Sequence, residues 1–554
     1  MKVLKIPLII LILLLLLYWI TLWTAGIWVN HKLSDSFAQS AMSSRYTLDV
    51  KRISIHPLIR TIRLHKLTLI PLNADSLIKV EKSLAELHIL KISLEGIDVR
   101  KFIETKQIQL ERLHLQSPNF ALTTDNTSKA KKTKTGQEIP ALFNGFYLRH
   151  LEISAGFFSL KNAGQKHSLI EIPLIDLSLE DISLVSDSLN HKQAFNISMA
   201  SDLELKSFSF RIPKSYYRLG AAAVSLNKDS GELLFEELSL KPFRGLYEQA
   251  TGLNLQDDVV EITIGRVQTK GFSSKALLSD KSLHLEGLFL DNPSIALLRD
   301  KRLPDDLLKR PKMPQALFKL HTQKFAIDSI HLINGTLSYT ELIGKEALEA
   351  TIRFDSLQAL ITGLSSVPNP KSGRNLIASA SAKLMSKGSV KTRIVWHESL
   401  RDSFSFEGSL GPMKINHINN MIKNATGAMF RSGTIDSILF HGAGNKYGAK
   451  GLFEMRYQNL DMALTKKRSE EPNKFLSKLL NMIIKSDNPS EDEGVRRVSM
   501  QADRVPYKGF FNLYWKTLED GLINTVKPGK KKNKDTNRSL KEEWEKLKQT
   551  LKSD

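Results

Sequence analysis

The chain has 554 residues, a formal net charge of +21 and no cysteine. This length suffices for about two to four compact domains or for one elongated repeat structure. The lack of cysteine excludes a disulfide framework and a thiolate metal site. The lysine-rich runs at residues 129–134 and 527–534 suit either a solvated tail or an anionic membrane surface. No aromatic–basic interleaving or DNA-reading motif supports a nucleic-acid partner.

A strongly apolar segment opens the chain. Residues 6–29 carry no charge, which makes the run long enough to span a bilayer and longer than the core of a cleavable signal peptide. Lysines precede the run, and tryptophans gather toward its far end, where aromatic side chains favour the interface. We predict an uncleaved transmembrane signal anchor over residues 1–31, with the N-terminus in the cytoplasm and the bulk of the chain outside the inner membrane. The candidate anchor residues are Ile6, Leu13, Trp19, Trp23 and Trp28.

A polar neck, residues 32–45, precedes a stretch that is written twice. Residues 46–72 align without a gap on residues 217–243, and residues 86–125 align on residues 261–300. About 12 of the 40 positions in the second alignment are identical, at a fixed offset of about 175 residues. We therefore predict one structural unit used twice, over residues 46–213 and 214–370. A Lys-, Thr- and Asn-rich segment near residues 123–138 predicts a disordered loop in the first unit.

The repeated unit has the pattern of β-strands. His114 lies between Leu113 and Leu115, and Ile175, Leu177 and Leu179 alternate with polar residues in the same way. Helices are expected to be short, over residues 100–107, 243–251 and 274–281. The fold class is therefore mainly β, an elongated antiparallel sheet with peripheral helices. Such a sheet must bury its apolar face in a filled sandwich or barrel, or leave it lining an open trough, and the alternation fits both.

The C-terminal region, residues 371–527, mixes strands and helices. Strands are expected over residues 433–441, 448–457 and 460–465, and helices over residues 417–423, 472–485 and 509–526. Residues 528–554 are a basic linker followed by a charged terminal helix, for which Ser539 is a candidate N-cap.

Catalytic motifs are missing from the sequence. It contains no HExxH, GxSxG, P-loop or EF-hand pattern. The glycines of residues 442–448 have the wrong spacing for a dinucleotide loop and predict a hairpin turn instead. The sequence therefore nominates no catalytic, cofactor-binding or metal-binding residue. We expect a binding or structural protein rather than an enzyme.

The C-terminal region resembles a known family. Residues 432–438 (SGTIDSI), Phe440, Asn445, residues 448–451 (GAKG) and residues 455–461 (MRYQNLD) resemble the conserved C-terminal block of AsmA-like proteins. The N-terminal anchor and the helix at residues 510–522 are similar to that family's pattern as well. The resemblance implies a protein anchored in the bacterial inner membrane that projects into the periplasm. It also implies a long β-sheet groove with an apolar interior, of the bridge-like lipid transfer type.

The resemblance implies a phospholipid ligand. Acyl chains would lie along inward-facing apolar side chains, and the protein would conduct lipid toward the outer membrane and support envelope integrity. No cofactor is implied, and the partners are phospholipid, the inner membrane and an outer-membrane or envelope protein. The alternative is a structural envelope scaffold or outer-membrane assembly factor, in which the same side chains pack under a helix or a second sheet. The candidate groove-lining residues are Leu113, Leu115, Phe120, Leu122, Leu288, Leu290, Ile295 and Leu297.

Overall fold

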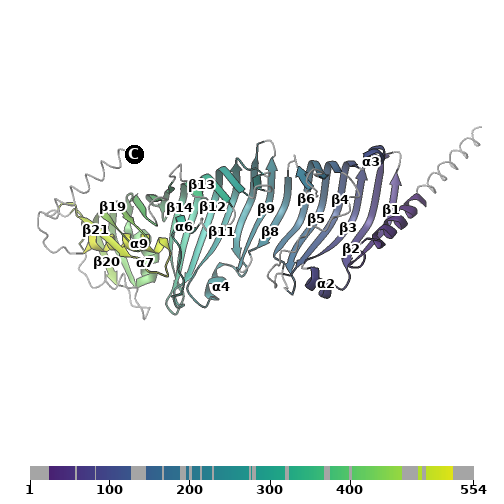
Figure 1. Ribbon diagram of the computed structural model, residues 1–554. Helices are drawn as coiled ribbons and strands as arrows, with labels where there is room; N and C mark the ends of the chain where they lie inside the picture. The colour runs from purple at the N-terminus through teal and green to yellow at the C-terminus, as the bar shows by residue number, and fades with distance from the viewer. Residues whose placement is uncertain are drawn as a thin grey trace, which may run out of the picture. The chain divides into compact units, whose positions relative to one another are not determined.

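The chain is mainly β in the computed structural model, with few and short helices (Figure 1). It divides into two compact units, Met1–Ser239 and Leu240–Asp554. The structure describes residues 24–40, 42–56, 59–81, 83–105, 107–125, 145–164, 168–186, 195–198, 203–212, 215–227, 230–273, 276–277, 282–317, 324–366, 375–397, 402–464, 485–489 and 494–527.

The first unit is a sheet in which neighbours along the chain pair in order. Pairing is antiparallel from β1 to β4 and from β5 to β6, whereas β4 and β5 are parallel. Both β7 and β8 pair with β6, β8 pairs with β9, and β9 pairs with β10. The strands are β1 (Tyr46–His56), β2 (Thr61–Pro71), β3 (Ser83–Glu95), β4 (Gln107–Thr124), β5 (Gly145–Asn162), β6 (Ile170–Ser186), β7 (Phe195–Ser198), β8 (Leu203–Arg211), β9 (Tyr217–Asn227) and β10 (Glu232–Pro242).

Three helices among the described residues accompany this sheet. α2 (Ala74–Glu81) and α3 (Val99–Thr105) connect successive strands and so lie at strand ends (Figure 1). A helix of residues 24–38 packs against β1, where Asn30 Nδ2 donates a hydrogen bond to the Val50 carbonyl over 3.3 Å. Gly26 approaches β1 so closely that a Cβ would lie 2.3 Å from the Ile53 carbonyl oxygen. The helix thus covers β1, the outermost strand of the sheet.

Most of the predicted anchor falls outside the described residues, including Ile6, Leu13, Trp19 and Trp23. Trp28 lies on the helix of residues 24–38, and 63% of its surface is exposed. Within the described ranges, no helix combines the length and the apolar character needed to cross a membrane.

The second unit is a sheet with a similar order. Pairing is antiparallel from β11 to β12, parallel from β12 to β13, and antiparallel from β13 through β17 to β19, β20 and β21. Short β18 pairs with β19. The strands are β11 (Asp258–Lys270), β12 (Ser282–Asp300), β13 (Lys324–Ile343), β14 (Leu348–Ser365), β15 (Leu376–Leu384), β16 (Gly388–Trp396), β17 (Phe404–Leu410), β18 (Met413–Lys414), β19 (Ala428–Gly444), β20 (Gly448–Leu464) and β21 (Arg497–Asp503).

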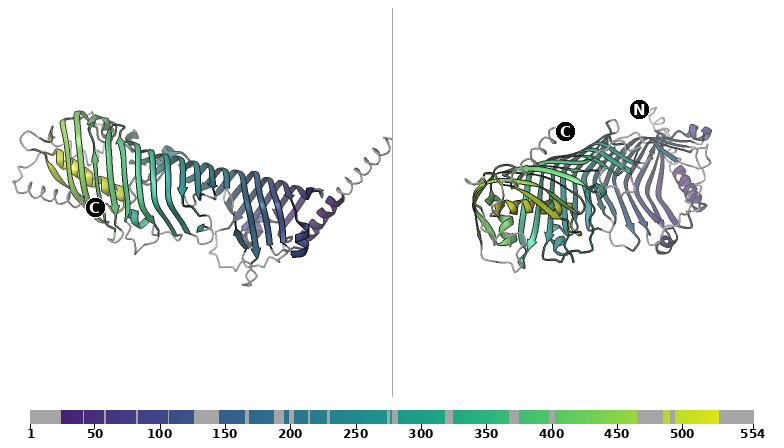
Figure 2. Two further views of the ribbon diagram at one scale, coloured as in Figure 1. Left: turned by 90° about the horizontal axis from the view of Figure 1, so that it is seen from above. Right: turned by 60° about the vertical axis from the view of Figure 1, so that its left-hand side comes forward.

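Several helices belong to this unit: α4 (Leu246–Thr251), α6 (Pro314–Leu317), the 3-10 helix η3 (Ile415–Ile418), α7 (Asn419–Thr426) and α9 (Phe510–Val526). α9 packs on β20 and β21. The strands around it curl, and Figure 2 shows α9 lying along their inner side.

The duplicated sequence segments adopt the same strands. β3 and β4 correspond to β11 and β12, and each unit contains one parallel pair at the equivalent place, β4–β5 and β12–β13. Even a close contact recurs: a Cβ on Gly156 would lie 3.3 Å from Pro118 Cγ, and one on Gly335 would lie 2.8 Å from Pro293 Cγ. The duplication therefore extends to strand order, strand direction and local packing.

The parallel pairs depart from the wholly antiparallel sheet that the alternation predicts. Parallel neighbours need a long connection, and residues 125–144 and 301–323 supply it here. The first of these overlaps the loop predicted near residues 123–138, but Thr123 and Thr124 still belong to β4. Alternation reports which side of a strand is apolar, not its direction, so the sequence pattern could not distinguish the two arrangements.

The C-terminal predictions fit with one correction. The strands expected at residues 448–457 and 460–465 are one strand, β20, which continues through Asn459 at φ 52. Asparagine tolerates this left-handed conformation, so the polar interruption bends the strand without ending it. The hairpin turn expected near residues 442–448 joins β19 to β20, and the helix expected at residues 509–526 is α9. The helices expected at residues 472–485 and 539–552 lie outside the described residues, as does most of the one at residues 274–281.

Candidate functional site: the two faces of the sheet

Apolar side chains form continuous rows across β1–β6. In each row, every residue lies directly opposite the next one on the neighbouring strand. Side chains opposite each other on adjacent strands point to the same face, so the rows make one apolar face. The first row is Ile53, Leu64, Ile92, Leu115, Ile153 and Leu177, and the second is Leu48, Leu69, Leu87, Phe120, Phe158 and Ile172.

An irregularity shared by β3 and β4, where Leu90 and Ser117 are both unpaired, keeps both halves of β4 on this face. Leu115 and Phe120 differ in parity, so strict alternation would point them to opposite faces. Ser117 adopts φ 48, in the left-handed region, and β3 skips a residue opposite it. The extra residue restores the phase. In β12, Asn292 at φ 52 has the same effect between Leu290 and Ile295. Each set of four predicted lining residues therefore lies on one face of its own sheet.

The candidate lining residues are neither packed in a core nor fully exposed. Leu113, Leu115, Phe120 and Leu122 on β4 are half-buried, and so are Leu288, Leu290, Ile295 and Leu297 on β12. Phe120 stacks on Phe158 of β5 with ring centroids 5.6 Å apart. Because α2 and α3 lie at strand ends, neither helix lies across these rows. The face is thus apolar, continuous across six strands and partly accessible.

The opposite face of the first sheet is polar, and it is cationic around the middle of β1–β3. One row across it is Arg52, His65, Lys91 and Gln116. Burial, followed by the nearby charges of Arg52, Lys91 and Arg63, lowers the pKa of His65 below its ordinary value. His114, the polar residue between Leu113 and Leu115, lies on this face and is half-buried, with Nε2 at 2.8 Å from Ser154 Oγ.

In the second unit, polar groups lie beside the apolar side chains of β11–β14 at one end of the strands. Leu297 lies opposite Tyr339, whose hydroxyl donates to Glu341 Oε1 over 2.9 Å. Burial and the charge of Glu341 raise the pKa of Tyr339 well above its ordinary value. Beside them, Arg299 donates to the carboxylate of Asp258 over 2.5 Å. Charged groups thus border the apolar face at one end of these strands.

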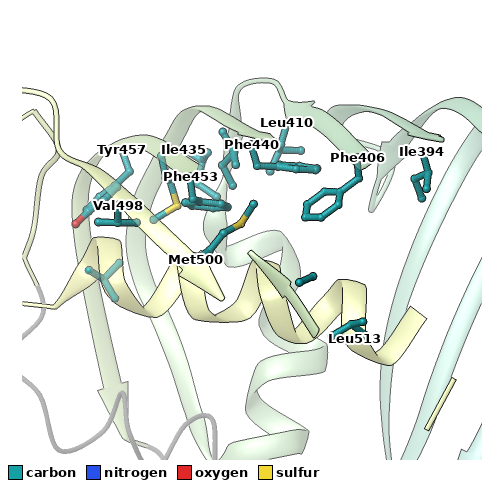
Figure 3. Close-up of a cluster of buried hydrophobic side chains, with 14 of the residues drawn as sticks. Ile394, Phe406, Leu410, Ile435, Phe440, Phe453, Tyr457, Val498, Met500 and Leu513 are labelled. Atoms are coloured by element: carbon teal, nitrogen blue, oxygen red, sulfur yellow. The ribbon is translucent and has the colours of Figure 1, made fainter. Parts of the chain in front are cut away.

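Farther along the second sheet, α9 covers the apolar face and fills it (Figure 3). Aromatic rings interlock there: Phe404 and Phe510 lie 4.9 Å apart, and Phe406 and Tyr514 lie 5.3 Å apart. The Tyr514 hydroxyl lies 2.9 Å from Thr392 Oγ1, which ties α9 to β16. This region is the main buried apolar cluster of the described residues. In this region the apolar face of the strands is packed under a helix, as in the alternative to an open groove.

Sequence reasoning missed what lies on each face. The helix at residues 509–526 was predicted, but not that it would cover β16–β21. The cations Lys51, Arg52, Lys66 and Lys91 were also missed, because they come from three strands that only the strand register brings together. A lysine or arginine near the middle of each successive strand was the available signal.

The comparisons with known proteins add no relative. No family model and no curated protein matches this chain. The described residues also contain no group of three or more His, Asp or Glu side chains that could hold a metal ion. The resemblance to AsmA-like proteins therefore stays a prediction.

Proposed function

We propose that this protein binds phospholipid along its apolar sheet face and conducts it, without catalysing a reaction. The observation that carries the proposal is the set of apolar rows that cross β1–β6, whose side chains are half-buried except for buried Ile53. A soluble protein rarely leaves so large an apolar surface without an occupant.

The physical chemistry of such a face suits acyl chains. Each methylene shielded from water contributes about 0.8 kcal/mol, so a chain lying across several strands would be held firmly. Neighbouring strands repeat every ~4.8 Å with similar side chains, so no single position binds much more tightly than the next. A lipid could therefore slide from strand to strand, with its head group kept in water at the open side.

The proposed location follows from the apolar N-terminal segment and the AsmA-like resemblance. The chain would be anchored in a bacterial inner membrane by residues 1–31, with the two sheets in the periplasm. Phospholipid would move along the sheet toward the outer membrane, supporting envelope integrity. The inner membrane and an outer-membrane or envelope protein would be its partners.

A second candidate is a structural envelope scaffold or assembly factor. The α9-filled cluster of the second unit favours it, because an apolar face packed by aromatic rings has no room for a ligand. In this alternative, the face of β1–β6 would only contribute to stability or contact another protein.

Lipid retention by the full-length chain separates these candidates. The test variant is Phe120→Glu, which places a charge in the middle of an apolar row. The matched control is Asn119→Glu, because Asn119 is the neighbouring residue on β4 but points to the polar face and is exposed. Each protein is purified in detergent, washed and extracted, and its phospholipid is quantified by mass spectrometry.

We expect phospholipid in the wild-type protein and in Asn119→Glu, and a loss of about tenfold in Phe120→Glu. Lipid associated with the anchor would be the same in all three proteins, so the difference reports the sheet. Equal lipid in both variants, or none in the wild type, would favour the scaffold.

A further inference from the structure

A hollow of about 620 Å³ lies between the helix of residues 24–38 and the polar face of β1–β4. It touches the apolar rows only at Ile53, the end of the first row, and its other strand residues point to the polar face. The lining consists of Gly26, Ile27, Asn30, Lys51, Arg52, Ile53, His65, Lys66, Leu90, Lys91 and Gln116.

The charges in this hollow have one sign. Lys51, Arg52, Lys66 and Lys91 contribute four cations, and no residue of the lining is acidic. The larger hollow of the second unit, about 760 Å³, differs because Glu407 lies 4.0 Å from Arg393 within it. Four cations around one space repel each other, and an anion placed among them would relieve that repulsion.

The backbone explains how these cations come together. On β1, β2 and β3 the pairing is interrupted at Lys51, Lys66 and Leu90 without a change of register, so two consecutive residues of each strand face the polar side. Lys66 adopts φ 54 to do so. As a result, Lys51 and Arg52 both face the polar side, and so do His65 and Lys66. These irregularities concentrate cations on the polar face and leave the apolar rows intact.

Apolar side chains border the same hollow. Ile27 is 42% exposed and Leu90 is 46% exposed. A free inorganic anion would not contact exposed aliphatic side chains. A phosphate attached to an apolar group would contact both the cations and these aliphatic side chains. The helix that forms one wall also overlaps the end of the apolar run of residues 6–29.

We propose that this hollow binds a phosphate group, and that its natural source is the head group of an anionic phospholipid. Arg52 and Lys91 would hold the phosphate oxygens through charge-assisted hydrogen bonds, with Lys51 and Lys66 adding charge at the mouth. The site goes beyond acyl-chain binding, because it lies on the other face of the sheet and does not need the apolar rows to be occupied.

His65 supplies a local reporter. Its pKa is held low by burial and by the charges of Arg52, Lys91 and Arg63. Lys51 and Lys66 from the same strands also line the hollow, and Asn30 is its polar residue on the helix. A bound phosphate favours the imidazolium form, so binding should raise the pKa of His65.

The experiment titrates the full-length chain with two probes, inorganic phosphate and the water-soluble lipid dihexanoyl phosphatidylglycerol. The pKa of His65 is followed by NMR of labelled histidine, assigned with His65→Gln. We expect both probes to raise it, and the lipid to bind more tightly. The double variant Arg52→Ala/Lys91→Ala should weaken binding by at least about tenfold. Arg100→Ala is the matched control, because Arg100 is a cation of the same unit outside the hollow with 89% of its side chain exposed.

Binding of inorganic phosphate alone would overturn the lipid assignment, and the absence of any shift with either probe would overturn the site. Equal binding by the double variant and the wild type would also overturn it. These outcomes do not depend on the amount of phospholipid that Phe120→Glu retains. Failure of the phosphate site and failure of the proposed function can therefore be distinguished.

Discussion

Two regions of this molecule have the same alternating strand pattern, but the apolar face is open in one and covered by a helix in the other. In β1–β6, apolar rows cross the sheet with mostly half-buried side chains, and no helix of the described residues lies across them. In β16–β21, equivalent rows are covered by α9, and Phe404 is only 1% exposed. Alternation in a strand therefore specifies that one face is apolar. Whether that face is a core or a surface for a ligand depends on an element elsewhere in the chain.

The two regions should differ most in how much stability is lost when an aromatic side chain is truncated to alanine. Phe404→Ala removes a ring packed against Phe406 and Phe510, and such truncations cost about 3–5 kcal/mol. Hydrogen exchange measured by mass spectrometry should show β16–β21 exchanging faster, with β1–β6 unchanged. Unaltered exchange in β16–β21 would mean that α9 does not stabilise this region.

Gly521 on α9 allows the cover itself to be loosened. A Cβ at Gly521 would lie 2.7 Å from the Phe453 ring, so Gly521→Val should push α9 away from β20 and cost about 1–3 kcal/mol. Gly509→Ala is the control, since no atom lies within 4 Å of a Cβ there. Binding of an apolar dye to Gly521→Val, but not to Gly509→Ala, would show that the face beneath α9 has been opened.

Tyr514 predicts a pH dependence confined to the filled region. Burial raises the pKa of Tyr514 to about 12, although its hydrogen bond with Thr392 opposes the shift. The neutral phenol therefore contributes stability that is present below pH ~10 and is lost as the pH rises through ~12. The free energy of unfolding should fall less over this interval in Tyr514→Phe than in the wild type. Tyr447→Phe, at an exposed side chain, should behave as the wild type.

The smallest effect is expected on the open face. Phe120→Ala removes a half-buried ring from β4, so it should cost only about 1 kcal/mol. Denaturant unfolding of the full chain measures this cost. A cost as large as that of Phe404→Ala would show that Phe120 is packed as tightly as a core residue, and the contrast between the two regions would disappear.

Much of the fold could be predicted from the sequence because its signals are local or repeated. Alternating residues such as Leu113 and Leu115 indicated strands, and the offset repeat predicted equivalent units. The direction of β5 and β13 could not be predicted, since a parallel and an antiparallel strand have the same alternation.

The faces could be predicted only in part. The eight candidate lining residues were chosen from their apolar pattern, but the irregularities at Ser117 and Asn292, which keep each set on one face, depend on backbone conformation rather than residue type. The cationic hollow needs the register of β1, β2 and β3 and the packing of a helix against β1. Long-range pairings of this kind leave no spacing in a single sequence.

Photo-crosslinking can show directly whether phospholipid contacts the open face of β1–β6 but not the face beneath α9. A benzophenone amino acid replaces Phe120 on the open face or Phe406 beneath α9 in the full-length chain, and adducts are identified by mass spectrometry after irradiation in cells. We expect phospholipid adducts at position 120 and none at position 406. Phospholipid at neither position, or equally at both, would contradict this expectation.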